Sequence, residues 1–478
     1  MNIAMEAANI LPELALAIGA MALLMLGAFV GDKHQPLLTY LAVGLLVIVG
    51  GLVVATPSVG AAFNGALFID DFARFVKVLV LGGAALVLIM GQSFLKREKL
   101  GRFEFPVLVV LSVLGMMVMA SAADFITLYL GMELQSLALY VLAAFDRDNV
   151  RSTEAGLKYF VLGALSSGMM LYGISLIYGF TGTTSFTDVA MIVSAGNLSI
   201  GLIFGLVFLI AGLAFKVAAV PFHMWTPDVY EGAPTPITAF FAASPKVAAM
   251  ALFARAVVEA FPGALDEWRQ IVIFISILSM VLGAFAAIGQ NNIKRLMAYS
   301  SIANMGYILV GLAAGTPEGV QGVLIYLAIY VVTNIGVFAC ILGMRRGANM
   351  VENISDLSGL AQTRPGYAFA FLILMFSLAG IPPMAGFFAK FYVFLAAVKA
   401  GLYPLAVIGV VASVVGAYYY VRIVKIIYFD EPAPAFESDM GASLAGIITA
   451  SGVFTLFFLL GAAPLITAAG AAAASLFP

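Results

Sequence analysis

The chain has 478 residues, of which 63% are hydrophobic and only 10% are charged. Soluble domains carry charge on roughly a quarter of their residues, so this composition excludes a soluble protein and indicates an integral membrane protein. We expect a lipid bilayer, and no nucleic acid, among its partners. The net charge of -2 is less informative than the places where the few charges lie.

Cysteine and histidine are too scarce for a redox centre. The single cysteine, Cys340, excludes a disulfide within the chain and an iron–sulfur cluster held by this chain alone. The two histidines, His34 and His223, give no plausible haem pair or zinc site. We therefore expect no cofactor and no metal in this chain, and any redox chemistry would belong to a partner.

Apolar windows of about 20 residues, long enough to cross ~30 Å of hydrocarbon, recur along the whole chain. The first lacks the basic start of a cleaved signal peptide, so it is read as a transmembrane helix. No hydrophilic stretch is long enough for a separate soluble domain. The sequence thus predicts one all-α membrane domain of about fourteen spans, near residues 10–30, 37–56, 71–92, 105–122, 124–144, 154–180, 198–230, 236–258, 269–289, 295–314, 319–344, 367–399, 402–429 and 442–466.

Basic residues predict the orientation, because cytoplasmic connections are enriched in Lys and Arg. Connections after even-numbered spans contain only Arg255, Arg269 and Lys399. Both termini are therefore expected on the outer, periplasmic side. The connections after odd-numbered spans, and the end of span thirteen, hold Lys33, Lys96, Arg97, Lys99, Arg102, Arg147, Arg151, Lys294, Arg295, Arg345, Arg346, Arg364, Arg422 and Lys425.

Charged residues inside predicted spans are the candidates for function. A charge at the centre of a membrane helix costs about 2.5–3.5 kcal/mol, so it is rare without a partner, a water cavity or a role. Glu133 lies near the middle of span five and Lys246 near the middle of span eight. Either residue could belong to a static ion pair, but a proton relay is the favoured interpretation for both. The basic residues within spans are Arg74, Lys77, Lys158, Lys216, Lys246 and Lys390.

Three of these basic residues lie near span ends. Lys158 is about one turn inside span six, where it could extend to the cytoplasmic edge or belong to a proton input region. Arg74 and Lys77 follow Asp70 and Asp71 at helical spacing, so surface ion pairs are the favoured interpretation there.

Two segments, residues 198–230 and 367–399, are too long for simple spans. Each would be ~50 Å long if wholly helical, against ~30 Å of hydrocarbon. Unwound backbone in a membrane is tolerated only where protein or water covers it, and discontinuous helices recur at ion sites of transporters. A proline kink is the simpler alternative for each. The helix-breaking residues are Pro221 and Pro227 in the first segment and Gly380, Pro382, Pro383 and Gly386 in the second, beside Lys216 and Lys390 respectively.

The two long segments are spans seven and twelve. Because five is odd, a duplicated five-helix unit would insert its second copy upside down, which predicts inverted repeats over spans 4–8 and 9–13. We accordingly divide the single domain into residues 1–104 (three helices), 105–258 (first repeat), 269–429 (second repeat) and 442–478 (last helix).

Three motifs carry a family resemblance. The segments "FKVAAVPFHMWTPDVYEGAPTPITAFFAASPKVAAMAL", "NNIKRLMAYSSIANMGYILVG" and "FSLAGIPPMAGFFAKFYVF" closely resemble the antiporter-like membrane subunits of respiratory complex I. The likeness covers essentially the whole chain and is greatest to the subunit N branch, the counterpart of mitochondrial subunit 2. In that family helices seven and twelve are interrupted.

The resemblance implies roles for individual residues. Glu133 matches the family's membrane glutamate, Lys216 its partner lysine, Lys246 the connecting lysine of helix eight, and Lys390 the charged residue of helix twelve. Lys158 is carried over as part of the input region.

The second motif adds Lys294, Tyr299 and Asn304 as supporting residues. Asn304 stands where many relatives have histidine, and asparagine does not titrate near neutral pH. Tyr299 and water could substitute for the histidine. His223, beside the first break, is expected to take part in the network or else only to pack there.

The resulting hypothesis is a proton-translocating, cofactor-free subunit of a bacterial NADH:quinone oxidoreductase in the plasma membrane. The resemblance implies FMN and iron–sulfur clusters in partner subunits, quinone bound elsewhere, and neighbours of the subunit M, J and K types. The alternatives are a subunit of a multi-subunit cation/proton antiporter, a purely structural membrane-arm subunit, or part of a membrane-embedded hydrogenase.

Overall fold

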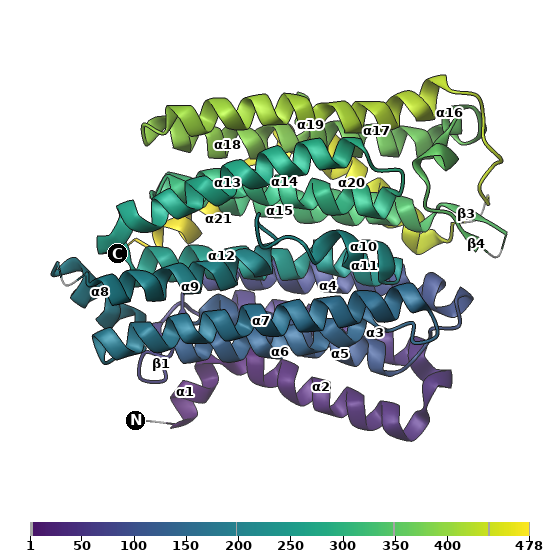
Figure 1. Ribbon diagram of the computed structural model, residues 1–478. Coiled ribbons are helices and arrows are strands. Elements are labelled where there is room, and N and C mark those ends of the chain that lie inside the picture. Colours follow the sequence, from purple (N-terminus) through teal and green to yellow (C-terminus); the bar gives the residue numbers. More distant parts are fainter. Residues whose placement is uncertain (1–2, 197, 348, 438–439, 478) are drawn as a thin grey trace.

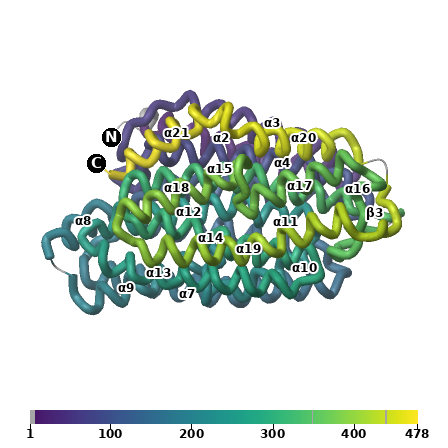
Figure 2. The backbone as a smooth tube through the Cα atoms, turned by 90° about the horizontal axis from the view of Figure 1, so that it is seen from above, coloured from purple at the N-terminus to yellow at the C-terminus, as the bar shows by residue number. Residues whose placement is uncertain are grey.

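The structure is a computed structural model that describes residues 3–196, 198–347, 349–437 and 440–477. Its long helices run roughly along one direction in both views (Figures 1 and 2). Both chain termini lie at the end that also carries β1 and α8, which we call the terminal end. The hairpin of β3 and β4 lies at the opposite end, which we call the basic end.

Helices make up nearly all of the described chain. The α-helices are α1 (Ile3–Asn9), α2 (Leu11–Val30), α3 (Gln35–Ala55), α4 (Asp71–Arg97), α5 (Glu104–Ser121), α6 (Phe125–Ala143), α7 (Val150–Thr181), α8 (Phe186–Ser194), α9 (Ile200–Val217), α10 (Thr226–Gly232), α11 (Thr235–Ala242), α12 (Ser244–Ala260), α13 (Leu265–Ile288), α14 (Ile293–Ala313), α15 (Pro317–Leu342), α16 (Leu360–Thr363), α17 (Pro365–Ala379), α18 (Ala385–Lys399), α19 (Tyr403–Phe429), α20 (Ala442–Gly461) and α21 (Ala463–Ala474). Short 3-10 turns cover Asp32–His34, Pro262–Ala264 and Ile354–Leu357.

Two small antiparallel hairpins lie in the connections. In one, β1 (Gly60–Ala62) pairs with β2 (Leu67–Ile69), with Ala61 opposite Phe68. In the other, β3 (Arg345–Arg346) pairs with β4 (Asn349–Met350). The sequence pattern predicted plain connections for both stretches. It also left α8 within a connection and did not separate the start of α21 from the last span.

The predicted spans and the all-α membrane fold class are confirmed. Within the described residues, 13 helical segments are long and apolar enough to cross a membrane. The broken pair of α17 and α18 supplies the remaining span. The chain is therefore an integral membrane protein, whereas the inverted relation of the two five-helix groups and the limits of the four parts stay predictions.

Spans seven and twelve are interrupted, as the prolines predicted. The first break separates α9 from α10 over residues 218–225, and the second separates α17 from α18 over residues 380–384. Each break contains a cis peptide bond, before Pro221 and before Pro383.

Span eight is interrupted as well, which the hydropathy pattern did not predict. α11 ends at Ala242, and α12 begins at Ser244 on the far side of Ala243, whose φ of -108° and ψ of -100° are not helical. At this interruption the Ser244 hydroxyl donates a hydrogen bond to the carbonyl of Val80 in α4, over 2.9 Å. The signal was Pro245, which lies in the first turn of α12, where proline is favoured because its missing N–H would have no helical partner there.

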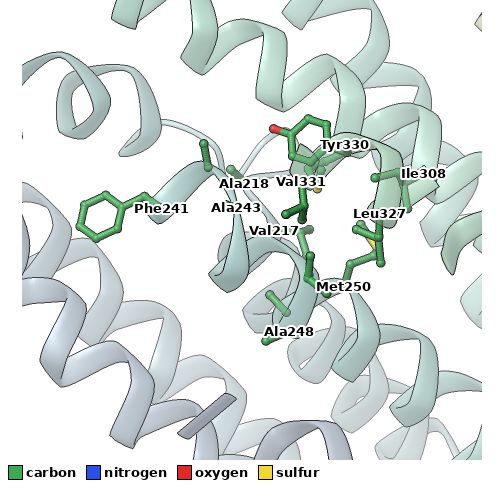
Figure 3. Packing of buried hydrophobic residues seen from close by; sticks show 14 of the residues in the cluster. Val217, Ala218, Phe241, Ala243, Ala248, Met250, Ile308, Leu327, Tyr330 and Val331 are labelled. Carbon is green, nitrogen blue, oxygen red and sulfur yellow. The ribbon is translucent and has the colours of Figure 1, made fainter. Parts of the chain in front are cut away.

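Burial differs greatly between spans, even between α2 and α15, which have equal hydropathy. The most apolar window of α2 is only 22% buried, whereas that of the α11–α12 span is 100% buried and those of α14 and α15 are each 94% buried. Figure 3 shows the packing around the first break, where Val217, Ala218 and Ala243 lie near Met250 and near Tyr330 and Val331 of α15. The centre of the molecule is thus built by spans seven, eight, ten and eleven.

Two basic residues are not where the sequence pattern placed them. Arg255, which we assigned to an outer connection, is fully buried within α12, because Asp70 and Glu259 compensate its charge. Lys77 does not form a surface pair. It is buried and pairs with Glu13 of α2 over 2.5 Å. Arg74 does form the expected exposed pair with Asp71, at 2.6 Å.

Candidate functional site: lysines at two broken helices

The first break is opened by a left-handed residue and a proline. Ala218 ends α9 with φ of 61° and ψ of 37°, and Pro221 has no backbone N–H to continue a helix. The freed backbone groups find side-chain partners. The Val220 N–H donates to Ser279 Oγ over 2.9 Å, and Trp225 Nε1 donates to the Phe215 carbonyl over 3.1 Å. The break is therefore held in place by polar side chains.

Lys216 lies one residue before the end of α9 and is buried. Its Nζ donates to Ser136 Oγ of α6 over 2.7 Å and to Tyr140 Oη over 3.4 Å. Glu133 lies one turn before Ser136 on the same face of α6, and its Oε1 accepts a 2.5 Å hydrogen bond from Ser167. Lys216 and Glu133 are thus neighbours, but no ion pair within 4.0 Å joins them in the described chain.

Lys246, the buried lysine of α12, completes the first break. Its Nζ donates over 3.0 Å to the carbonyl of Val217, the last residue of α9, and lies 5.2 Å from the centre of the Trp225 ring. A cation at a helix C-terminus is stabilised by the free carbonyls and the helix dipole, and the ring adds a cation–π contact. Lys246 therefore lies beside Val217, the residue that follows Lys216 in the sequence.

At the second break a buried lysine again donates to the last carbonyl of a helix, but this lysine belongs to the broken helix itself. Gly380 ends α17 with a φ of 84°, and a Cβ added there would lie 2.9 Å from the Lys390 side chain. Lys390 of α18 donates to the carbonyl of Ala379, the last residue of α17, over 3.0 Å and to Ser413 Oγ over 2.7 Å. It also lies 4.6 Å from the centre of the Tyr307 ring. At both breaks a buried ammonium group thus donates to a freed carbonyl.

Polar groups on α14 and its neighbours lie in the buried region between the breaks. Asn304 donates to the Ser300 carbonyl over 2.8 Å and accepts from Tyr326 over 2.7 Å, while Ser300 and Tyr420 share a 2.5 Å hydrogen bond. Asn304 therefore belongs to a hydroxyl network. Tyr299 is half-buried and has no hydrogen bond from its hydroxyl within the described chain.

Three further buried hydroxyl groups were missed by sequence reasoning. They belong to Tyr230, Ser301 and Tyr330, and the two tyrosine hydroxyls both face Ser301. None of the three makes a hydrogen bond of ordinary geometry within the described residues. Buried polar groups in this state are normally satisfied by ordered water. No single-sequence signal marks a buried serine or tyrosine of this kind.

A polar cavity of about 630 Å³ opens at the basic end, between the α10–α11 turn, the start of α14 and the β4 region. Lys294 lines it and donates to Glu352 Oε1 and to the Ala233 carbonyl, both over 2.9 Å. Glu352 is a partner that the sequence pattern did not single out.

An ion-pair network beside this cavity connects α10 to α7 and to α14. Asp228 of α10 accepts from Lys158 of α7 and from Arg295 of α14, each over 2.7 Å. Lys158 also pairs with Glu154, and Arg295 with Glu231. The structure therefore places Lys158 in an ion-pair network at the basic end, beside this cavity. Asp228 could have been singled out as a charge beside a break.

His223 lies in the turn between α9 and α10 and is half-buried. It joins none of the lysines through a direct hydrogen bond in the described chain. Pro221, Pro382 and Pro383 are exposed on the surface of the chain, so both breaks reach that surface. In a membrane such backbone requires cover from protein or water.

The comparisons with known proteins agree with this geometry. A model of the family described as "NADH:quinone oxidoreductase/Mrp antiporter, TM" matches residues 122–416. The chain is 62% identical over 469 residues to NADH-quinone oxidoreductase subunit N of Parvibaculum lavamentivorans, covering 98% of this chain and 97% of that one. It is 60% identical to subunit N 1 of Rhizobium meliloti over 468 residues, covering 98% and 97% of the two chains.

Solved structures show the same fold. A chain of respiratory complex I from Thermus thermophilus superposes with a TM-score of 0.83 at 32% identity, covering 96% of this chain and 99% of that one. A chain of the Mrp complex from Dietzia gives a TM-score of 0.87 at 24% identity, covering 100% and 98% of the two chains, and so reports on the fold alone.

Proposed function

Because the chain belongs to the membrane-protein family of NADH:quinone oxidoreductases and Mrp antiporters, we propose that it is a proton-translocating membrane subunit of a NADH:quinone oxidoreductase. The observation that carries the proposal is the set of three buried lysines, each at or beside the free C-terminal carbonyls of a broken helix. Burial without a contacting carboxylate makes the protonation state of such groups sensitive to small changes in their surroundings.

The proton path runs through Glu133, Lys216, Lys246 and Lys390 in that order. Moving negative charge at Glu133 away from Lys216 favours release of the lysine's proton. Lys246 lies beside Val217, one residue from Lys216, and is the next acceptor. The hydroxyl groups around Ser301 and Asn304, with water between them, connect the first half to Lys390 of the second.

Protons enter from the basic end and leave at the terminal end. The cavity lined by Lys294 and Glu352 supplies the aqueous entrance, and the Asp228 network sets the position of α10 beside it. In this proposal the basic end faces the bacterial cytoplasm and both termini face the periplasm, which is the orientation that the distribution of Lys and Arg predicts.

The chain performs no redox chemistry itself. Oxidation of NADH and reduction of quinone take place in partner subunits that hold FMN and iron–sulfur clusters, and quinone binds elsewhere in the complex. The chain's neighbours in the membrane arm are an antiporter-like subunit of the M type and small subunits of the J and K types. Electron transfer acts on this chain through the electrostatics of those neighbours.

A cation/proton antiporter subunit is the second candidate, because the Mrp chain shares the fold over the full length. Purification of the native assembly separates the two. Co-purifying flavin and iron–sulfur clusters support the first proposal, and their absence from an intact assembly supports the second.

Lys216→Ala and Glu133→Ala test the mechanism in the assembled complex. Vesicles are assayed for NADH oxidation and for proton uptake per NADH, with Lys399→Ala at the exposed end of α18 as the matched control. We expect normal assembly, a lower proton yield in both site variants, and no change in the control. Assembled site variants with the wild-type proton yield would rule out this path and favour a structural role.

A further inference from the structure

A second cavity, of about 690 Å³, lies at the terminal end, far along α12 from Lys246. Segments distant in the sequence build it: the β1–β2 hairpin, α8, the end of α12, the start of α13 and the last residues after α21. Its rim at Gly60, Ala61, Thr187 and Pro262 is exposed. The volume falls in the range of small-molecule sites.

The cavity has an acidic wall over a buried guanidinium. Arg255, which is fully buried, donates to both oxygens of Asp70 over 2.8 and 2.7 Å and to Glu259 Oε1 over 2.8 Å. Asp70 and Glu259 line the cavity. Two carboxylates against one guanidinium leave a formal charge of -1.

The second oxygen of Glu259, Oε2, is buried and has no hydrogen-bond partner within the described residues. A buried carboxylate oxygen without a hydrogen-bond donor is unfavourable, even though the other oxygen of the same group is paired with Arg255. The excess negative charge therefore favours a cationic group in the cavity.

The remaining walls are apolar and largely aromatic. They include Phe68, Phe186, Trp268, Leu476 and Phe477. Aromatic faces beside a carboxylate are the surroundings in which proteins hold ammonium groups, and apolar walls suit acyl chains better than a hydrated metal ion. The occupant that fits these walls has an ammonium group, which lies against the carboxylates, and an apolar body.

The position of the cavity in the fold indicates that this amphiphile is a membrane lipid. The cavity lies where α12 ends, at Ala260, and α13 begins, at Leu265. Both are membrane spans, so this is the level at which lipid head groups lie. We propose that the cavity is a binding site for a phospholipid with an ammonium head group, which lies against Asp70 and Glu259.

Photo-crosslinking in the assembled complex tests this proposal. The complex, in nanodiscs, is exposed to phosphatidylethanolamine or to phosphatidylglycerol, each carrying the same photoreactive acyl chain, and the labelled peptides are mapped by mass spectrometry. We expect phosphatidylethanolamine to label the segments of Phe186, Trp268 and Phe477 about tenfold more than phosphatidylglycerol, the ratio corresponding to one charge-assisted hydrogen bond.

Matched variants separate head-group recognition from general lipid contact. Glu259→Gln retains an oxygen to accept from Arg255 but removes the charge, and should abolish the preference. Asp266→Asn, an exposed acid of α13 outside the cavity, should leave it unchanged. Ala190→Trp fills the cavity and should remove labelling by both lipids. Equal labelling by the two lipids, or none within these segments of the wild-type complex, would overturn the proposal.

Discussion

At the break between α9 and α10 the carbonyl of Val217 receives its hydrogen bond from Lys246, a residue of another span. At the break between α17 and α18 the carbonyl of Ala379 receives it from Lys390, a residue of the same broken helix. Neither Lys216 nor Lys390 has an ion pair within 4.0 Å in the described chain, but the charge of Glu133 on α6 acts on Lys216, whereas no acidic residue acts on Lys390 in this way. Equivalent backbone geometry therefore supports two different charge environments, one suited to a change in charge and one to onward transfer.

The largest expected effect distinguishes capping from proton transfer. In Lys246→Gln and Lys390→Gln the amide can still donate to the freed carbonyl but cannot carry a proton. Assembly should survive, while proton translocation through this subunit should fall by about 100-fold, a typical contribution of a positioned acid–base group. Proton uptake per NADH in vesicles is the measurement. Wild-type pumping by either variant would show that the substituted lysine only caps the helix and carries no proton.

The second break depends on Gly386, whereas no glycine lies within residues 218–225 of the first break. A Cβ on Gly386 would lie 1.9 Å from the Ser377 carbonyl oxygen, whereas a Cβ on Gly446 of α20 would meet nothing within 4 Å. Gly386→Ala should therefore destabilise the fold by about 1–3 kcal/mol through overpacking. Thermal unfolding of the purified complex provides the measurement, with Gly446→Ala as the control. Equal midpoints would show that α18 can shift freely.

Only the first break is anchored by an ion-pair network within the described residues. Asp228→Asn weakens two ion pairs of α10 at once, and the partial exposure of these groups limits the expected loss to about 1 kcal/mol. Glu154→Gln, which removes the more exposed partner of Lys158, should cost less. Unfolding midpoints at low and high salt measure both. A larger effect of Glu154→Gln would contradict the network as described.

The smallest effect concerns the backbone of the first break. Ala218 occupies a left-handed conformation that glycine adopts without penalty. Ala218→Gly should therefore change the unfolding free energy by no more than about 1 kcal/mol, towards stability, because Gly also loses more entropy on folding. A clear loss of stability would mean that the Ala218 methyl group, within the packing seen in Figure 3, outweighs the backbone strain.

Local signals in the sequence predicted the features that depend on local chemistry. Apolar length marks a span, and prolines mark a break. Spans seven and twelve, with the lysines beside them, were therefore predictable from the amino-acid sequence alone. The interruption at Ala243 was also marked by Pro245, but the surrounding window remained apolar enough to read as one helix.

Pairings between distant spans were not predictable in this way. Lys216 contacts Ser136, a residue of a span 80 positions earlier, and Lys77 pairs with Glu13 of another helix. Hydropathy cannot reveal such pairs, because an exposed span such as α2 and a buried span such as α15 are equally apolar. Arg255 was misplaced for the same reason, since its compensating acid Asp70 lies 185 residues away.

The source of each capping lysine also bears on the order in which the protein is built. The α17–α18 segment brings Lys390 into the membrane together with the carbonyl that it caps. The α9–α10 segment does not, because Lys246 belongs to α12, which follows it along the chain. During synthesis the first break can complete its hydrogen bonding only after span eight has inserted, so spans seven and eight enter their final state as a pair.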